Sequence, residues 1–242
     1  MLLPVTALAQ TTANDINYIY YTWDDTNHAL TRHSGTATAT DVTERDTSWG
    51  ENDNQEHWYV VNGDITISSR ISVTGDVHLI LADGCKLTAN GGIEVSGSLI
   101  IYGQSTDNTS MGKLAATGDA GKAGISGGTI TIHGGIVTAT GGTGGAGISG
   151  AGAVTIHGGT VTATGGNDKA GISSDTFSTT ATGNAFIIAS RIEVLDNNAQ
   201  SGVIIVGNVG TVYGDKVTLT TDATIPSGKT LKIESDKTLT IG

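Results

Sequence analysis

Short runs in which apolar and polar residues alternate recur along most of the chain. Around residue 132, for example, Ile130, Ile132 and Val137 alternate with Thr and His. A period of two residues is typical of β-strands that bury one face. Most runs end in Gly, often as a Gly-Gly pair, which permits the positive φ of a sharp turn. The pattern therefore predicts many short strands joined by tight corners.

The stretch 123–166 contains the same pattern twice. Its halves repeat with a period of 24 residues, so that His133 corresponds to His157 and Thr140 to Thr164. A fixed period of this length is typical of solenoids, in which neighbouring turns bury the apolar residues that one turn cannot bury alone. With two or three short strands in each repeat, the sequence predicts an all-β fold, a right-handed parallel β-helix.

The repeat extends in both directions from this stretch. Residues 114–123 align without a gap on 137–146, and residues 87–92 are predicted to form the turn before 114–123. We therefore expect two outward columns, rich in threonine, side by side on one face. The predicted columns are Thr88, Ala115, Thr138, Thr162 and Thr180, and Asn90, Thr117, Thr140, Thr164 and Thr182.

The sequence divides into three parts. Residues 1–9, with small residues at Ala7 and Ala9, are predicted to be the remnant of a secretion signal, and an ordinary N-terminal tail is the alternative. Residues 10–58 hold all three tryptophans and are predicted to cap the open end of the solenoid. Residues 59–242 should form the parallel β-helix. We expect the natural protein to extend beyond both ends of this sequence.

Charge and composition limit the partners and the location. The net charge is −11 and the isoelectric point is about 4.7, so the surface should repel nucleic acids and anionic membranes. No run is long and apolar enough to insert into a membrane. The single cysteine, Cys85, excludes an internal disulfide, and its parity with Leu87 favours a place in the core. These features suit an extracellular or cell-surface protein.

Two groups of side chains are candidates for binding a polysaccharide, such as a host or cell-wall glycan. Aromatic rings stack on the apolar faces of sugars, but they are also a natural cover for the first turn. An array of hydroxyl groups could dock a glycan, but β-branched residues also favour strand packing by themselves. The candidate residues are Trp23, Trp49, Trp58 and Tyr59 in the first group, and Thr138, Thr140, Thr162 and Thr164 in the second.

Calcium is the one cofactor that the sequence suggests. The corners 118–122 and 166–169 occupy equivalent places in different repeats, and their oxygen-bearing side chains suit Ca²⁺. The candidate ligands are Asp119, Asn167 and Asp168. The alternative is a pair of solvated turns, because the corner between them, at 143–145, has no carboxylate.

No catalytic constellation stands out in the sequence. Glycoside hydrolases use paired carboxylates at a set separation, and we find no such pair on a predicted strand. His133 and His157 should stack outward on neighbouring turns, and we expect them to be solvated, because two imidazoles are too few for a closed metal site. The sequence therefore favours a module that is not an enzyme. A polysaccharide lyase or a glycoside hydrolase is the alternative.

Several strings resemble Gly-rich repeat surface proteins of gut-type bacteria. They are 58–68, 78–89, 99–104, the Ala-Gly-Ile-Ser repeats from 123 to 173, and 225–231. That group is similar to the pectate-lyase-like right-handed β-helix superfamily, which includes carbohydrate-binding modules as well as lyases and hydrolases. The resemblance, over about residues 58–241, implies display or adhesion at the cell surface, tethered to further domains. The Thr face is also similar to that of β-solenoid antifreeze proteins, so ice binding is a further alternative.

Overall fold

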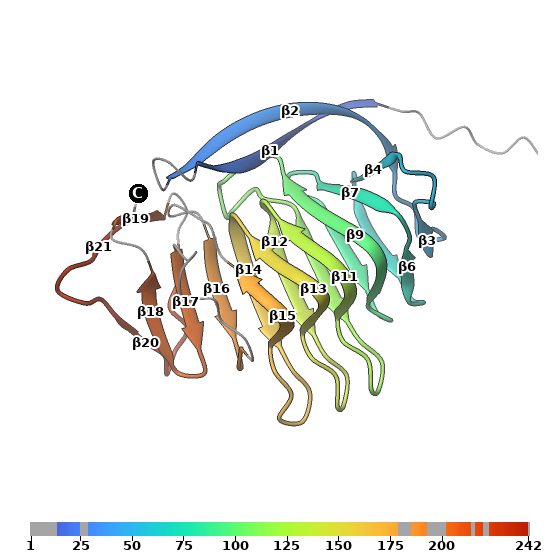
Figure 1. The fold of residues 1–242 in the computed structure, drawn as a ribbon. Helices are drawn as coiled ribbons and strands as arrows, with labels where there is room; N and C mark the ends of the chain where they lie inside the picture. Colours follow the sequence, from blue (N-terminus) through green and yellow to red (C-terminus); the bar gives the residue numbers. More distant parts are fainter. Residues whose placement is uncertain are drawn as a thin grey trace, which may run out of the picture.

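The protein folds as a β-solenoid of about 7 turns, built from stacked parallel strands (Figure 1). The computed structural model describes residues 14–24, 29–178, 185–192, 202–213, 216–219 and 223–241. In these residues the secondary structure is all β, with no helix. The predicted fold class, a parallel β-helix, is thereby confirmed. The described residues also contain no helix of the length and hydrophobicity that crossing a membrane requires.

Two large sheets form the wall of the solenoid. Sheet 1 contains β1 (Asn14–Asp24), β2 (Ala29–Asp41), β3 (Ser48–Trp49), β4 (Glu56–Val61), β6 (Ile71–Val73), β7 (Asp76–Leu81), β9 (Ile93–Gly103), β11 (Ile125–Ile132), β13 (Ile148–Ile156) and β15 (Ile172–Ser178). Sheet 2 contains β5 (Asp64–Ile67), β8 (Lys86–Ala89), β10 (Lys113–Thr117), β12 (Ile136–Thr140), β14 (Gly159–Thr164), β16 (Ala185–Ala189), β17 (Gly202–Val206), β18 (Val209–Tyr213) and β20 (Thr230–Lys232). A small third sheet pairs β19 (Lys216–Leu219) with β21 (Thr238–Ile241).

Each turn of the coil has three sides because the long strands of sheet 1 bend. In β9, residues 93–95 pair with β6, whereas residues 98–103 pair with β7. One hydrogen-bonded strand therefore contributes to two sides of the coil, and the strands of sheet 2 form the third. The bend lies at Gly97, where a Cβ atom would come within 2.0 Å of the carbonyl oxygen of Gly75.

The register of sheet 2 follows the sequence repeat. Strands β8, β10, β12 and β14 pair in parallel without a shift, and residues 114–117 lie beside 137–140 as predicted. The fifth position of the first Thr column differs from the prediction. The next strand is β16, which places Ile188 beside Thr162, whereas Thr180 and Thr182 lie outside the described residues.

Inward side chains form one continuous hydrophobic core along the solenoid. It extends from Val42 in the first turn to Ile204 near the other end and consists mainly of Ile, Val, Leu and Ala. Trp49 is fully buried at the first turn, and its ring stacks on Tyr59 at a centroid distance of 5.7 Å. These two rings pack together at the first turn of the core.

The rest of the N-terminal region takes a different place from the predicted cap. Strands β1 and β2 form a long antiparallel hairpin that lies along the side of the solenoid (Figure 1). Thr40 of β2 pairs with Tyr59 of β4, and Ile19 of β1 pairs with Gly103 of β9. The hairpin lies there because outward residues of sheet 1 are apolar, and the hairpin buries them. The buried residues of this second cluster are Ala39, Val60, Ile80, Ala82 and Tyr102.

The C-terminal part departs from the uninterrupted parallel coil that was expected through residue 242. Strands β17 and β18 are antiparallel and are joined by a tight turn at Gly207 and Asn208. Strands β16 and β17 carry apolar side chains on both faces, so their outer face also requires a cover. That cover comes from the third sheet, in a cluster of Phe186, Val203, Ile205, Val212, Val217 and Leu219.

Candidate functional site

The outer face of sheet 1 brings acidic and aromatic side chains together where β4, β7 and β9 lie side by side. The register pairs Glu56 with Asp76 and Trp58 with His78, and Ser98 follows Asp76 on the next turn. The acids lie beside the aromatic rings because residues two apart on a strand share a face. We call this surface the acid–aromatic strip: Glu56, Trp58, Asp76, His78, Ser98 and Tyr102.

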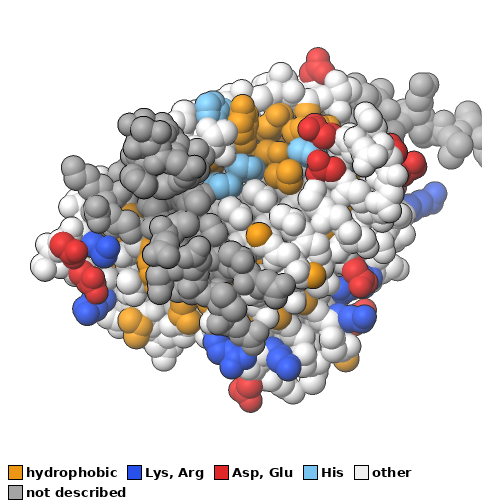
Figure 2. All heavy atoms as spheres, viewed as in Figure 1, with side chains coloured by type: hydrophobic (Ala, Val, Ile, Leu, Met, Phe, Trp, Pro, Cys, Tyr) orange, Lys and Arg blue, Asp and Glu red, His pale blue; other side chains and the backbone are white. Residues whose placement is uncertain are grey.

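Rings on neighbouring turns stack along this face. The centroids of Trp58 and His78 are 4.1 Å apart, and those of Tyr102 and His133 are 5.2 Å apart. His133 and His157 stack at 4.8 Å, which confirms that they lie outward on adjacent turns. Figure 2 shows hydrophobic and histidine side chains gathered on one face of the molecule, beside acidic ones.

The expectation that His133 and His157 are solvated is wrong, because both are half-buried. Strand β1 lies over His133, and the backbone N–H of Tyr21 donates to its Nδ1 at 3.1 Å. Burial lowers the pKa of His133 to about 3, and the neighbouring His157 and His78 act in the same direction. Burial also lowers the pKa of His157 to about 4. Both imidazoles are therefore neutral near pH 7.

His78 is held in one orientation within the strip. It is only 6% exposed, and its Nδ1 hydrogen-bonds with the hydroxyl of Tyr102 at 2.9 Å. Burial lowers the pKa of His78, although Asp76 and Glu56 oppose this shift. Its Nε2 lies 3.6 Å from Oδ1 of Asp76, too far for a hydrogen bond, and has no hydrogen-bond partner. This nitrogen is therefore sealed from solvent and faces the carboxylate of Asp76 at ion-pair distance.

The two carboxylates of the strip are each fixed by one donor. The indole N–H of Trp58 donates to Oε2 of Glu56 at 3.0 Å. The hydroxyl of Ser98 donates to Oδ1 of Asp76. Because each donor occupies one oxygen atom, lone pairs on the other oxygen remain available to a ligand.

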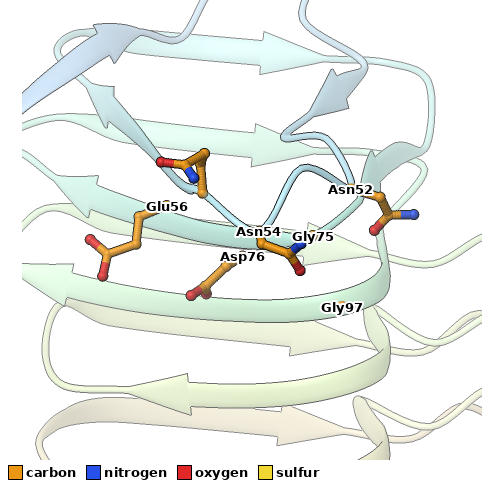
Figure 3. Close-up of a pocket in the computed structure, with 7 residues that line it drawn as sticks. Asn52, Asn54, Glu56, Gly75, Asp76 and Gly97 are labelled. Carbon is orange, nitrogen blue, oxygen red and sulfur yellow. The ribbon is translucent and has the colours of Figure 1, made fainter.

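A polar hollow adjoins the acid end of the strip (Figure 3). Its lining residues are Asn52, Asn54, Gln55, Glu56, Gly75, Asp76 and Gly97. Glu56 and Asp76 extend from neighbouring strands, with their carboxylates directed to the same side in Figure 3. The described residues that line the hollow supply amides, carboxylates and backbone, but no Lys or Arg. The hollow can therefore form many hydrogen bonds and favours a neutral or cationic ligand.

The structure separates the predicted aromatic candidates. Trp58 is half-buried on the outer face, whereas Tyr59 packs against the interior core. Trp49 has no exposed surface, so its prediction as a ligand-binding residue is wrong: its ring fills the first turn of the core. The side chain of Trp23 lies outside the described residues.

The predicted threonine array lies on sheet 2, whereas Trp58 belongs to sheet 1. The pairs in this array are Thr138 with Thr162 and Thr140 with Thr164. The array is narrow, since Ala115 precedes Thr138 and Ile188 follows Thr162. Docking of a glycan there stays a prediction, but the described strands do not form the broad threonine lattice that ice binding would use.

The predicted calcium corners stack in a row. Backbone hydrogen bonds join corner 118–122 to 141–145, and 141–145 to 165–169. Asp119 and Asp168 are therefore two strand spacings, or about 10 Å, apart, too far to share one ion. The described residues contain no group of three His, Cys, Asp or Glu side chains suited to a metal. These corners do not assemble the calcium site that the sequence suggested.

The sequence alone did not identify Glu56, Asp76 and His78 as members of one site. Their pairing depends on the alignment of 56–61 with 76–81, two segments with little sequence in common. The signal available in the sequence was the alternation of apolar and polar residues. This alternation predicts strands but does not say which residues of two neighbouring strands pair.

No protein-family model matches the chain, and neither a curated protein nor a solved structure matches it. The structure itself defines the class of protein, a β-solenoid of the parallel β-helix type. The resemblance to Gly-rich bacterial surface proteins stays an expectation from the sequence.

Proposed function

We propose that the protein is a non-enzymatic display or adhesion module, located outside the cell, that binds carbohydrate at the acid–aromatic strip. The observation that carries this proposal is the half-buried ring of Trp58 beside the amides and carboxylates of the hollow. An aromatic surface next to a few placed polar groups is the usual composition of a sugar-binding site.

Other features support the same role. The continuous core provides a rigid support for the strip. The acidic charge and the predicted secretion signal favour a place at the cell surface, where a host glycan or a cell-wall glycan is the partner. The module is tethered there to further domains of a longer chain.

Binding to an array of polysaccharides, with and without Ca²⁺, tests this function. Trp58→Ala should weaken binding to any glycan that is found by about tenfold, or about 1.4 kcal/mol. Thr138→Ala is the matched control on sheet 2 and should leave binding unchanged. Weakening by Thr138→Ala alone would place the site on the Thr face. Failure to bind any glycan would reject the carbohydrate function.

The paired acids favour a second candidate, a glycoside hydrolase. Glu56 and Asp76 lie side by side on adjacent turns, and hydrolysis of a glycosidic bond commonly uses two carboxyl groups. A reducing-end assay on each bound glycan distinguishes the two functions. A binding module produces no new ends, whereas a hydrolase produces ends that Glu56→Gln and Asp76→Asn abolish.

A further inference from the structure

A second surface of the coil carries charge of the opposite sign. The corner loops 118–122, 141–145 and 165–169 connect strands of sheet 2 to strands of sheet 1, and Figure 1 shows them projecting side by side from the coil. We propose that this corner binds linear polysaccharides that carry an acid on alternate sugars. The inference goes beyond the proposed function, because it concerns another surface and another class of glycan.

Cations gather at this corner although the chain as a whole is acidic. Two hollows lie beside the loops, and their described lining residues include four cations and two acids, whereas the chain has 12 Lys and Arg residues and 23 acids. Figure 2 shows basic side chains along this edge of the molecule. An anionic ligand is therefore attracted here more than to the rest of the surface. We call this surface the basic corner: Arg70, Lys122, Ser126, Ser149, Lys169 and Arg191.

One cation of the basic corner belongs to the fold, and two are free for a ligand. Arg70 donates from Nε to Oε2 of Glu94 at 3.0 Å and from Nη2 to Oγ of Ser126 at 2.7 Å. Glu94 is thereby neutralised. Lys122 and Lys169 are exposed and form no ion pair with any residue that the structure describes. These two lysines therefore supply the charge that an acidic ligand would meet.

The register of the loops sets the distance between the two lysines. Lys122 and Lys169 occupy the same place in their corners, and the corner between them has Gly145 there. Free cations therefore recur on alternate turns, about 10 Å apart. One pyranose unit lengthens an extended glycan by about the distance between two turns. A glycan with an acid on every second sugar thus brings one carboxylate to each lysine.

The rest of the lining explains why the ligand is a glycan. Ser126 and Ser149 lie side by side on β11 and β13, and their hydroxyls can form hydrogen bonds with those of sugars. The described lining residues include no aromatic side chain, whereas protein partners commonly bury aromatic anchors. Nucleic acid carries denser charge than a glycan with alternate acids, and the net charge of −11 opposes its approach.

Fluorescence polarisation with a labelled hyaluronan hexasaccharide, in which glucuronic acid alternates with N-acetylglucosamine, tests the location. Lys122→Gln and Lys169→Gln should each weaken binding about threefold, and the double variant about tenfold. Lys113→Gln is the matched control, because Lys113 is exposed on β10 and lines neither hollow, and it should leave binding unchanged. Circular dichroism checks that each variant is folded.

Two other hexasaccharides test the selectivity. The N-acetylglucosamine hexamer has the same length but no acid, so any binding that it shows should not respond to the lysine variants. The galacturonic acid hexamer has an acid on every sugar, and its second set of carboxylates would meet the corner at Gly145, which has no cation. It should therefore bind more weakly than hyaluronan. Tighter binding of the galacturonic acid hexamer would overturn the preference for alternate acids.

The outcomes separate this inference from the proposed function. If hyaluronan does not bind, the basic corner is rejected as a glycan site, while binding of other glycans that depends on Trp58 still supports the acid–aromatic strip. If Trp58→Ala weakens hyaluronan binding and the double lysine variant does not, the ligand lies on the strip and this inference is wrong. If Lys113→Gln weakens binding as much as Lys122→Gln, general charge attraction replaces the specific site.

Discussion

At the scale of single residues, the environment of His133 decides its chemistry. The ring lies between Tyr102 and His157 in the stack, and its Nδ1 accepts the backbone N–H of Tyr21. Accepting this bond requires an unprotonated Nδ1. A charged imidazolium would lose the bond, and burial would penalise its charge, which is why the pKa is about 3 rather than the ordinary 6.5.

Acidification should therefore destabilise the protein and release the β1–β2 hairpin from the rest of sheet 1. Between pH 6.5 and about 3 the unfolded chain binds a proton that folded His133 does not, so stability decreases as the pH falls through this window. His157, with a pKa of about 4, acts in the same direction. Urea unfolding at a series of pH values measures the effect.

A variant that keeps the acceptor but does not titrate separates His133 from other groups. His133→Gln can still accept from Tyr21, so its unfolding free energy should depend less steeply on pH between 6.5 and 3. A slope as steep as that of the unaltered protein would show that His133 does not cause the acid sensitivity.

At the scale of elements, glycine permits the backbones of neighbouring turns to approach closely where a strand bends. Gly97 packs so closely on the carbonyl oxygen of Gly75 that a Cβ atom would lie 2.0 Å from it. Gly97→Ala should lower the free energy of unfolding by about 3 kcal/mol, because backbone atoms on two turns must separate. Gly121→Ala is the control, since Gly121 has a φ of +76° but open space around it, and it should cost about 1 kcal/mol. Equal losses in denaturant unfolding would contradict this account of the corner.

The sequence repeat predicts the elements well wherever the period is regular. The pairing of 114–117 with 137–140 follows directly from it. The prediction fails at Thr180 because β16 provides the next strand and places Ile188 in the column. The site on sheet 1 could not be predicted in the same way. The alternation of apolar and polar residues in β1 predicts a strand. It does not predict that this strand lies over Tyr102, because the contact depends on packing between segments that are distant in the sequence.

At the scale of the whole molecule, the acidic side chains of the predicted calcium corners lie on separate turns. Asp119 and Asp168 are separated by a corner without a carboxylate. Ca²⁺ at millimolar concentration should therefore change the melting temperature by less than about 1 °C. An ion that binds the folded protein, at a concentration far above its Kd, would raise the melting temperature by more. Calorimetric melting with Ca²⁺ and with a chelator measures this. A rise of several degrees that Asp168→Asn removes would restore the calcium site.

The separate hydrophobic clusters should also make the molecule unfold in parts. The interior core extends along the coil, whereas the outer cluster around Val212 and Leu219 holds only the C-terminal strands. In solenoids each turn is stabilised chiefly by its neighbours, so a defect at one end stays local. Val212→Ala, which removes buried apolar volume at a cost of about 2 kcal/mol, should speed hydrogen exchange in β17 and β18 and leave β9 to β13 protected.

A matched change in the interior core provides the comparison. Ile130 is fully buried between turns in the middle of the coil, and Ile130→Ala should reduce protection in β9, β11 and β13 together. If Val212→Ala also reduced protection in these central strands to the same degree, the whole chain would unfold as one cooperative unit. The outer C-terminal cluster would then be part of the structure that holds the coil together, rather than a cover that can open while the acid–aromatic strip stays folded.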